Sequence, residues 1–95
     1  MKELEDIRRE LDAVDRDMVR LFEKRMALSG QVAEYKLTHN LPVLDRSREE
    51  KVLASRAAML EDSRLAGSVC ALYEEIMRLS RQEQQRIVEE AEGHA

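Results

Sequence analysis

The feature that most constrains the fold of this chain is a long helical repeat of apolar residues in its first third. Between about Lys2 and Leu37, apolar residues recur at steps of three and four with no internal proline. This spacing places them on one face of an α-helix that is roughly 50 Å long. The repeat consists of Leu4, Ile7, Leu11, Val14, Met18, Leu21, Leu28, Val32 and Tyr35.

One position in this repeat is occupied by a cation. The apolar residue due at position 25 is Arg25. Lys36 follows on the same helix, within about 20° of the same face at about 100° per residue. An inward-facing arginine is costly unless an anion pairs with it. We interpret the two cations as part of an interior anion site. For either residue alone, a cation extending from the edge of the bundle is the alternative.

The rest of the sequence predicts two shorter helices. Pro42 closes the first helix, and the second begins near Asp45 or Ser47, either of which can cap it, and runs to about Leu60. After a polar break at 61–64, a third helix carries one apolar stripe. Its members are Leu65, Val69, Leu72, Ile76 and Ile87.

The composition agrees with an all-α fold class. Aromatic residues make up only 3% of the chain, and no segment alternates between apolar and polar residues with period two. We expect one domain over residues 1–88. Residues 89–95 lack a core-facing pattern and are expected to be a frayed acidic tail or the start of a linker.

The predicted helix lengths favour dimerisation. The second and third helices would span about 25 Å and about 35 Å, too little to cover the apolar stripe of the first. We therefore expect a three-helix protomer with one long N-terminal helix, in an intertwined helical homodimer.

The two shorter helices also place polar groups on their inward faces. On the third, Ser80 and Gln84 interrupt the apolar stripe one turn apart; on the second, Asp45, Arg48 and Glu49 lie in the first turn. Each group has a simpler explanation when it is taken alone. Ser80 and Gln84 can mark the end of the buried stripe, Asp45 can be an N-cap only, and the pair Arg48 and Glu49 can lie on a solvated face. Together they provide cations, neutral donors and carboxylates, which suits a small, polyanionic, hydroxylated ligand.

These residues and their spacing closely resemble the all-helical AroQ-type chorismate mutases over nearly the whole chain. The resemblance is carried by Ile7-Arg8-x-x-Leu-x-x-x-Asp15, Arg25, Lys36, Pro42-Val43-x-Asp45-x-x-Arg48-Glu49 and Ser80-x-x-x-Gln84. It implies the rearrangement of chorismate to prephenate in phenylalanine and tyrosine biosynthesis, a reaction that needs no cofactor. A metal site is not expected either, because His39 and His94 have no cysteine or carboxylate companions at metal-ligand spacing.

The resemblance also implies a role for each site residue. Arg25 and Arg8 would bind the two substrate carboxylates, with Ser80 assisting at the ring carboxylate. Lys36 and Gln84 would donate hydrogen bonds to the ether oxygen of the breaking bond. Glu49 would accept from the ring hydroxyl, and Asp45 and Arg48 would complete that wall.

In the family, Arg8 comes from the other protomer, and helix geometry agrees with this. Arg8 lies about 25 Å along the axis from Arg25 and about 100° around it. One straight helix cannot easily hold a ligand of chorismate's size with both residues. An antiparallel partner helix would deliver a second Arg8 to the site.

Two other functions stay open at this point. One is isochorismate pyruvate-lyase activity, although members of that branch differ in the second-helix block and lack the matching carboxylate. The other is a non-catalytic regulatory or dimerisation module of a shikimate-pathway enzyme, and fusion to or association with such an enzyme is a related expectation.

Charge and hydropathy narrow the possible partners. The net charge of −4 and the absence of a basic, aromatic-interleaved cluster argue against a nucleic-acid partner. No apolar run approaches the length that spans a membrane, and the N-terminus is too charged for a signal peptide. We expect a cytoplasmic protein.

Overall fold

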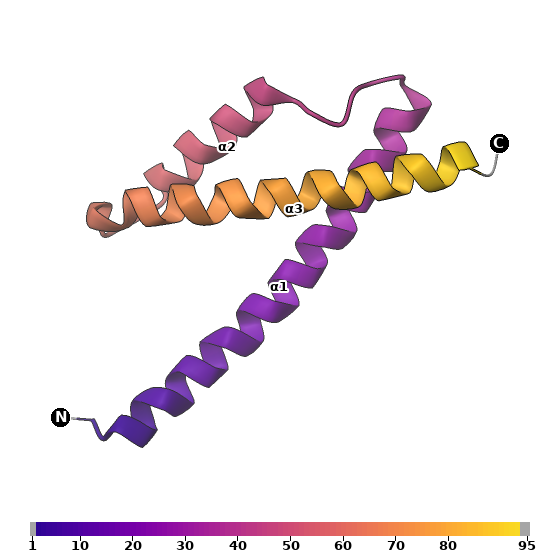
Figure 1. The fold of residues 1–95 in the computed structure, drawn as a ribbon. Helices are drawn as coiled ribbons and strands as arrows, with labels where there is room; N and C mark the ends of the chain where they lie inside the picture. Colours follow the sequence, from indigo (N-terminus) through magenta and orange to yellow (C-terminus); the bar gives the residue numbers. More distant parts are fainter. Residues whose placement is uncertain (1, 94–95) are drawn as a thin grey trace.

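The computed structural model describes residues 2–93, in which the chain forms three α-helices and one short 3-10 turn (Figure 1). Helix α1 spans Leu4–Thr38, α2 spans Arg46–Ala58, the turn η1 spans Ser63–Leu65, and α3 spans Ala66–Gly93. The predicted all-α class with one long N-terminal helix is confirmed. The described residues extend 61 Å along the longest axis and 14 Å along the shortest. A shape this thin leaves little interior.

Local chemistry sets the boundary between α1 and α2. At the end of α1, Asn40 adopts a left-handed backbone conformation (φ 56°), and the Leu41 N–H donates to the Lys36 carbonyl at 2.9 Å. Of the two candidate caps for α2, Asp45 is the one used, because its Oδ1 accepts from the Arg48 N–H at 3.0 Å. The cap also fixes where the first turn of α2 begins.

Helix α3 is the central element of the chain. It packs against both α1 and α2, whereas α1 and α2 have no Cα atoms within 8 Å of each other in the described part of the chain. Small residues allow α1 to approach α3 closely: Ser29 and Ala33 are buried, and a Cβ added at Gly30 would lie 3.3 Å from Ile87 Cδ1. The space between α1 and α2 is therefore left for long side chains.

The faces used for packing differ from the predicted stripes. On α1, the side facing α3 carries the buried residues Ser29 and Ala33. Leu28 and Val32 each directly precede one of these residues and therefore lie about 100° away around the helix, where they are 49% and 44% exposed. On α3, the buried residues are Met77, Ser80 and Gln84.

The third predicted stripe was wrong for two of its members. Leu65 belongs to the turn η1 and is 49% exposed, and Leu72 is 47% exposed. Leu72 lies about 140° around α3 from Met77, so it cannot share the face that packs on both neighbouring helices. The polar positions Ser80 and Gln84, in contrast, lie at the centre of that buried face.

Helix α3 also continues further than predicted. It ends at Gly93 rather than near Val88, so residues 89–93 are helical and not frayed. Glutamate and alanine favour helix, and side-chain pairs one turn apart support the extension: Gln85 Nε2 donates to Glu89, and Arg86 bonds to Glu90 at 2.6 Å. His94 and Ala95 of the predicted tail lie outside the described residues, and the domain boundary at 88 stays a prediction.

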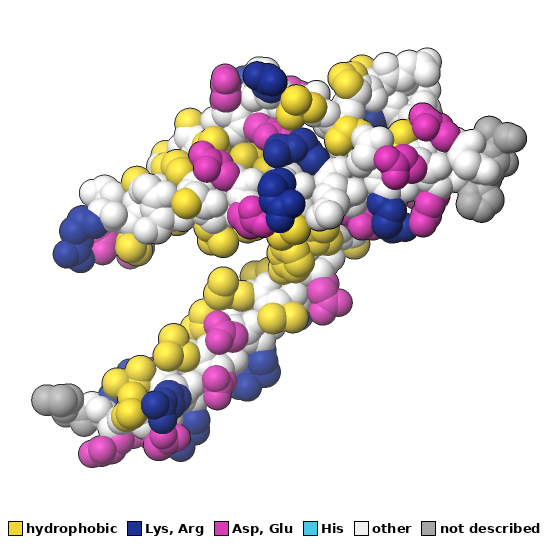
Figure 2. All heavy atoms as spheres, viewed as in Figure 1, with side chains coloured by type: hydrophobic (Ala, Val, Ile, Leu, Met, Phe, Trp, Pro, Cys, Tyr) yellow, Lys and Arg dark blue, Asp and Glu magenta, His cyan; other side chains and the backbone are white. Residues whose placement is uncertain are grey.

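The N-terminal half of α1 projects away from α2 and α3 as an extended arm (Figure 1). Figure 2 shows apolar side chains gathered along this arm. We call them the α1 stripe, and each is between 43% and 58% exposed: Leu4, Ile7, Leu11, Val14, Met18 and Leu21. Monomeric proteins seldom expose a continuous apolar surface of this kind. No helix in residues 2–93 has the length and apolar character needed to cross a membrane.

Candidate active site

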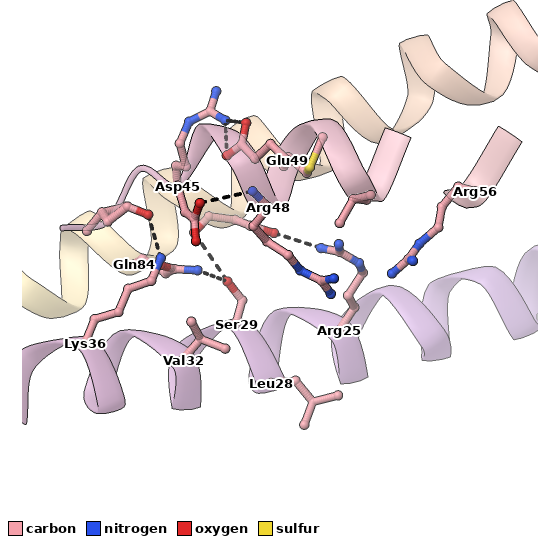
Figure 3. Close-up of a pocket in the computed structure, with 15 residues that line it drawn as sticks. Arg25, Leu28, Ser29, Val32, Lys36, Asp45, Arg48, Glu49, Arg56 and Gln84 are labelled. Atoms are coloured by element: carbon pink, nitrogen blue, oxygen red, sulfur yellow. Dashed lines mark hydrogen bonds and ion pairs between the residues drawn. The ribbon is translucent and has the colours of Figure 1, made fainter. Parts of the chain in front are cut away.

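A cavity of about 300 Å³ lies between the three helices, at the small end of the range for small-molecule sites (Figure 3). Seven of the eight predicted site residues line it, although they come from three separate helices. They are Arg25 and Lys36 from α1, Asp45, Arg48 and Glu49 from the start of α2, and Ser80 and Gln84 from α3.

One end of the cavity holds two hydrogen-bond donors side by side. Lys36 Nζ donates to the Val43 carbonyl at 2.6 Å and to Gln84 Oε1 at 3.1 Å. Gln84 is buried, and its Nε2 donates to Ser29 Oγ at 2.9 Å. Because the amide nitrogen carries two hydrogens and the ammonium three, each group keeps a donor for a ligand. Their mutual contacts hold both groups in place before any ligand arrives.

Ser29 belongs to this network, and the sequence analysis missed it. It is buried, and its Oγ also donates to the Ser80 carbonyl at 3.5 Å. The available signal was its position one turn after Arg25, on the same side of α1. Within the described residues, every buried side-chain nitrogen and oxygen has a hydrogen-bond partner. The polar interior is thus fully satisfied, and it supports the two donors.

The other end of the cavity is rich in arginine. Arg25 Nη1 donates to Ser80 Oγ at 3.1 Å, and Figure 3 shows the guanidinium groups of Arg25, Arg48 and Arg56 directed toward one another. Within residues 2–93, none of these three has a carboxylate oxygen within 4.0 Å. Arg56 was also missed by the sequence analysis, because it lies two turns beyond the motif at the start of α2.

The two carboxylates of the cavity are already engaged. Asp45 caps α2, and Glu49 forms an ion pair with both of its oxygens on Arg81 Nη1, with 2.6 Å to Oε2. Arg81 is a third lining residue that the sequence analysis missed, since nothing in its spacing on α3 distinguishes it from a surface cation.

The cavity is strongly cationic in a chain that is acidic overall. Five basic and two acidic side chains line it, giving a formal charge of +3, whereas the whole chain carries −4. Cations at this density around a concave site attract and hold anions. A ligand with two negative charges fits this balance.

Arg8 is the one predicted site residue that does not line the cavity. It is exposed on the N-terminal arm of α1, where its Nη1 bonds to Glu5 at 2.9 Å. Its contribution to a site on a second protomer stays a prediction.

Comparison with known proteins agrees with the geometry of the site. The family model described as chorismate mutase type II matches residues 7–85. The T-protein of Haemophilus influenzae is 37% identical over 78 residues, which cover 82% of this chain and 20% of that protein. The T-protein of Enterobacter agglomerans is 33% identical over 76 residues, covering 80% of the chain and 20% of that protein.

A bifunctional chorismate mutase/prephenate dehydratase from Aquifex aeolicus is 35% identical over 52 residues, or 55% of this chain and 14% of that protein. The chain therefore spans about a fifth or less of the curated relatives it matches. No solved structure matches it significantly. With the family model covering most of its length, the resemblance drawn from the motifs is confirmed: the chain belongs to the chorismate mutase type II family.

Proposed function

We propose that this chain catalyses the rearrangement of chorismate to prephenate. The observation that carries the proposal is that one cavity combines two kinds of group. Lys36 and Gln84 provide hydrogen-bond donors at one end of the cavity, and arginines without carboxylate partners lie at the other end. Chorismate has two carboxylates and an ether oxygen between them. The cavity offers groups that match each of these features.

The reaction is a concerted Claisen rearrangement, so the protein needs to supply neither a nucleophile nor a proton. It must hold the extended substrate as a compact, chair-like conformer and stabilise the charge that develops on the ether oxygen. A millionfold acceleration corresponds to about 8 kcal/mol of differential stabilisation. Preorganised donors typically contribute about 3 to 4 kcal/mol each, so Lys36 and Gln84 together account for most of that.

The remaining groups bind and orient the substrate. Arg25, with Ser80, is placed to take a carboxylate. Glu49, held by Arg81 at the wall of the cavity, is placed to accept a hydrogen bond from the ring hydroxyl, with Asp45 and Arg48 beside it. These assignments extend the roles implied by the family to the geometry of this chain.

We further propose that the functional unit is an intertwined homodimer in which each site receives Arg8 from the partner. The exposed α1 stripe supports this, because a second copy of the same helix would bury it. The distance of about 25 Å between Arg8 and Arg25 along α1 supports it as well, because an antiparallel partner helix would close that distance.

The first test is the loss of chorismate absorbance on addition of purified protein, with identification of the product. Prephenate as the product would support the proposal. Pyruvate and salicylate formed from isochorismate, without turnover of chorismate, would replace it by the lyase function. If a folded protein reacts with neither substrate, the function that remains is that of a non-catalytic regulatory or dimerisation module.

The name of the Aquifex relative pairs mutase with dehydratase activity, and we propose that an enzyme consuming prephenate is fused to or associated with this chain.

Substitution of Gln84 by glutamate is expected to make the reaction depend on acid. An amide donates at any ordinary pH, whereas a carboxyl group donates only when it is protonated. Each pH unit above the pKa of the introduced carboxyl lowers its protonated fraction about tenfold, so activity should rise as the pH falls from neutral toward 5. The pH profiles of kcat for the wild type, Gln84→Glu and Gln84→Ala would test this. An unchanged profile for Gln84→Glu would contradict contact between Gln84 and the ether oxygen.

A further inference from the structure

We infer that Arg56, near the C-terminal end of α2, is a further carboxylate-binding residue and shares with Arg25 the same carboxylate of the substrate. The inference rests on the proposed function and adds to it a residue outside the motifs that carry the family resemblance.

Arg56 and Arg25 are brought together by one aromatic ring. The guanidinium carbon of Arg25 lies 5.7 Å from the centroid of the Tyr73 ring, and that of Arg56 lies 5.8 Å from the same centroid. Both are within the range of a cation–π interaction. Because α1 and α2 have no Cα atoms within 8 Å of each other in the described residues, Tyr73 on α3 is the shared platform for two cations from different helices at one end of the cavity.

The bonding of Arg56 leaves its charge unmatched. Its Nη1 donates to Ser55 Oγ at 2.8 Å, a neutral partner, and it is only partly exposed. Arg64, Arg78 and Arg86, by contrast, all bond to carboxylates on the surface. Two partly desolvated guanidinium groups on one ring repel each other unless an anion lies between them.

A carboxylate is the anion that fits between these groups. Its two oxygens together accept about four hydrogen bonds, so Arg25, Arg56 and the Ser80 hydroxyl can all donate to one such group. Figure 3 shows Arg56 and Arg25 directed toward the same region of the cavity. Arg56 would thus contribute to substrate affinity rather than to the stabilisation of charge at the ether oxygen.

Kinetics of prephenate formation test the assignment. Arg56→Gln is expected to raise KM about tenfold with kcat within about twofold of the wild type, as for the loss of one charge-assisted hydrogen bond. Arg56→Lys keeps the charge but not the planar donor pair, so its KM should lie between those of the wild type and Arg56→Gln. Arg46→Gln is the matched control, because Arg46 lies on the same helix, is exposed and does not line the cavity. An Arg56→Gln variant with the KM of the control would overturn the inference.

A purely structural role for Arg56 would give a different result. Loss of packing on Tyr73 would lower the unfolding temperature of Arg56→Gln and reduce the active fraction, with KM unchanged. Thermal unfolding followed by circular dichroism separates the two roles, and that outcome would also overturn the inference.

A binding measurement keeps the inference separate from the proposed function. The chain has two tyrosines and no tryptophan, so in a Tyr35→Phe background Tyr73 is the only strong fluorophore. Titration with adipate, a dicarboxylate that does not absorb where tyrosine does, should change its emission saturably. Arg56→Gln in the same background should weaken that binding about tenfold. If chorismate is not turned over, the proposed function fails, and this titration still decides the role of Arg56. Equal affinity in both proteins, or no binding by either, would overturn it.

Discussion

Replacing Lys36 with alanine is expected to lower kcat by about two to three orders of magnitude and to leave the protein folded. Lys36 reaches the cavity from α1, and its Nζ lies 3.1 Å from Gln84 Oε1. In the proposed mechanism, the two groups donate to the ether oxygen from adjacent positions. An interaction made mainly in the transition state affects kcat more than KM. Steady-state kinetics of chorismate consumption would measure both.

The expected loss must be separated from a structural effect, because Lys36 also donates to the Val43 carbonyl at 2.6 Å. Lys24→Ala is a suitable control, since Lys24 is an exposed lysine on the same helix that does not line the cavity. Both variants should show the same helicity and a similar unfolding temperature. A Lys36→Ala variant that retains more than about a fifth of wild-type kcat would remove Lys36 from the proposed mechanism.

Mixed dimers of two impaired variants are expected to regain activity when it is measured at a chorismate concentration well below the KM of Arg8→Ala. Arg8→Ala alone should raise KM while the dimer persists, and Lys36→Ala alone should lose turnover. When the two chains are co-expressed in equal amounts, half of the dimers should contain one of each. In such a dimer, one site combines the intact Lys36 of one chain with the intact Arg8 of the other. About a quarter of all sites in the mixture would then be complete.

Activity near a quarter of the wild-type value would support two sites, each built from both chains. If each site were formed by a single chain, every site in the mixture would lack one of the two residues and no activity would return. Arg9→Ala provides the matched control for Arg8→Ala, because Arg9 is an exposed neighbour on the same arm of α1. Mixtures of Arg9→Ala with Lys36→Ala should give the activity expected from the Arg9→Ala chains alone.

Most of the site was predictable because its residues break a pattern. Arg25 stands where an apolar residue is due, and Ser80 and Gln84 interrupt the stripe of α3, so their inward position could be read from helical periodicity. The cap at Asp45 likewise had a local sequence signal. These residues line one cavity in the structure. Each of them could be predicted because its signal lies within a single helix.

The residues that were missed depend on packing between helices. Arg56 and Arg81 look like ordinary surface cations within their own helices, and their contacts with Tyr73 and Glu49 depend on how neighbouring helices pack. The face of α1 that packs on α3 was also misassigned. Small residues such as Gly30 and Ala33 determine close helix packing, whereas the hydrophobic repeat points to the larger residues beside them.

The α1 stripe has a consequence for how this protein behaves at different concentrations. In the homodimer proposed above, a second copy covers the stripe that residues 2–93 leave exposed, and such association obeys mass action. The unfolding temperature then rises with the amount of protein present, and dilution weakens the fold along with the assembly. For a chain of this kind, the level of synthesis determines what fraction of the molecules is folded as well as how many there are.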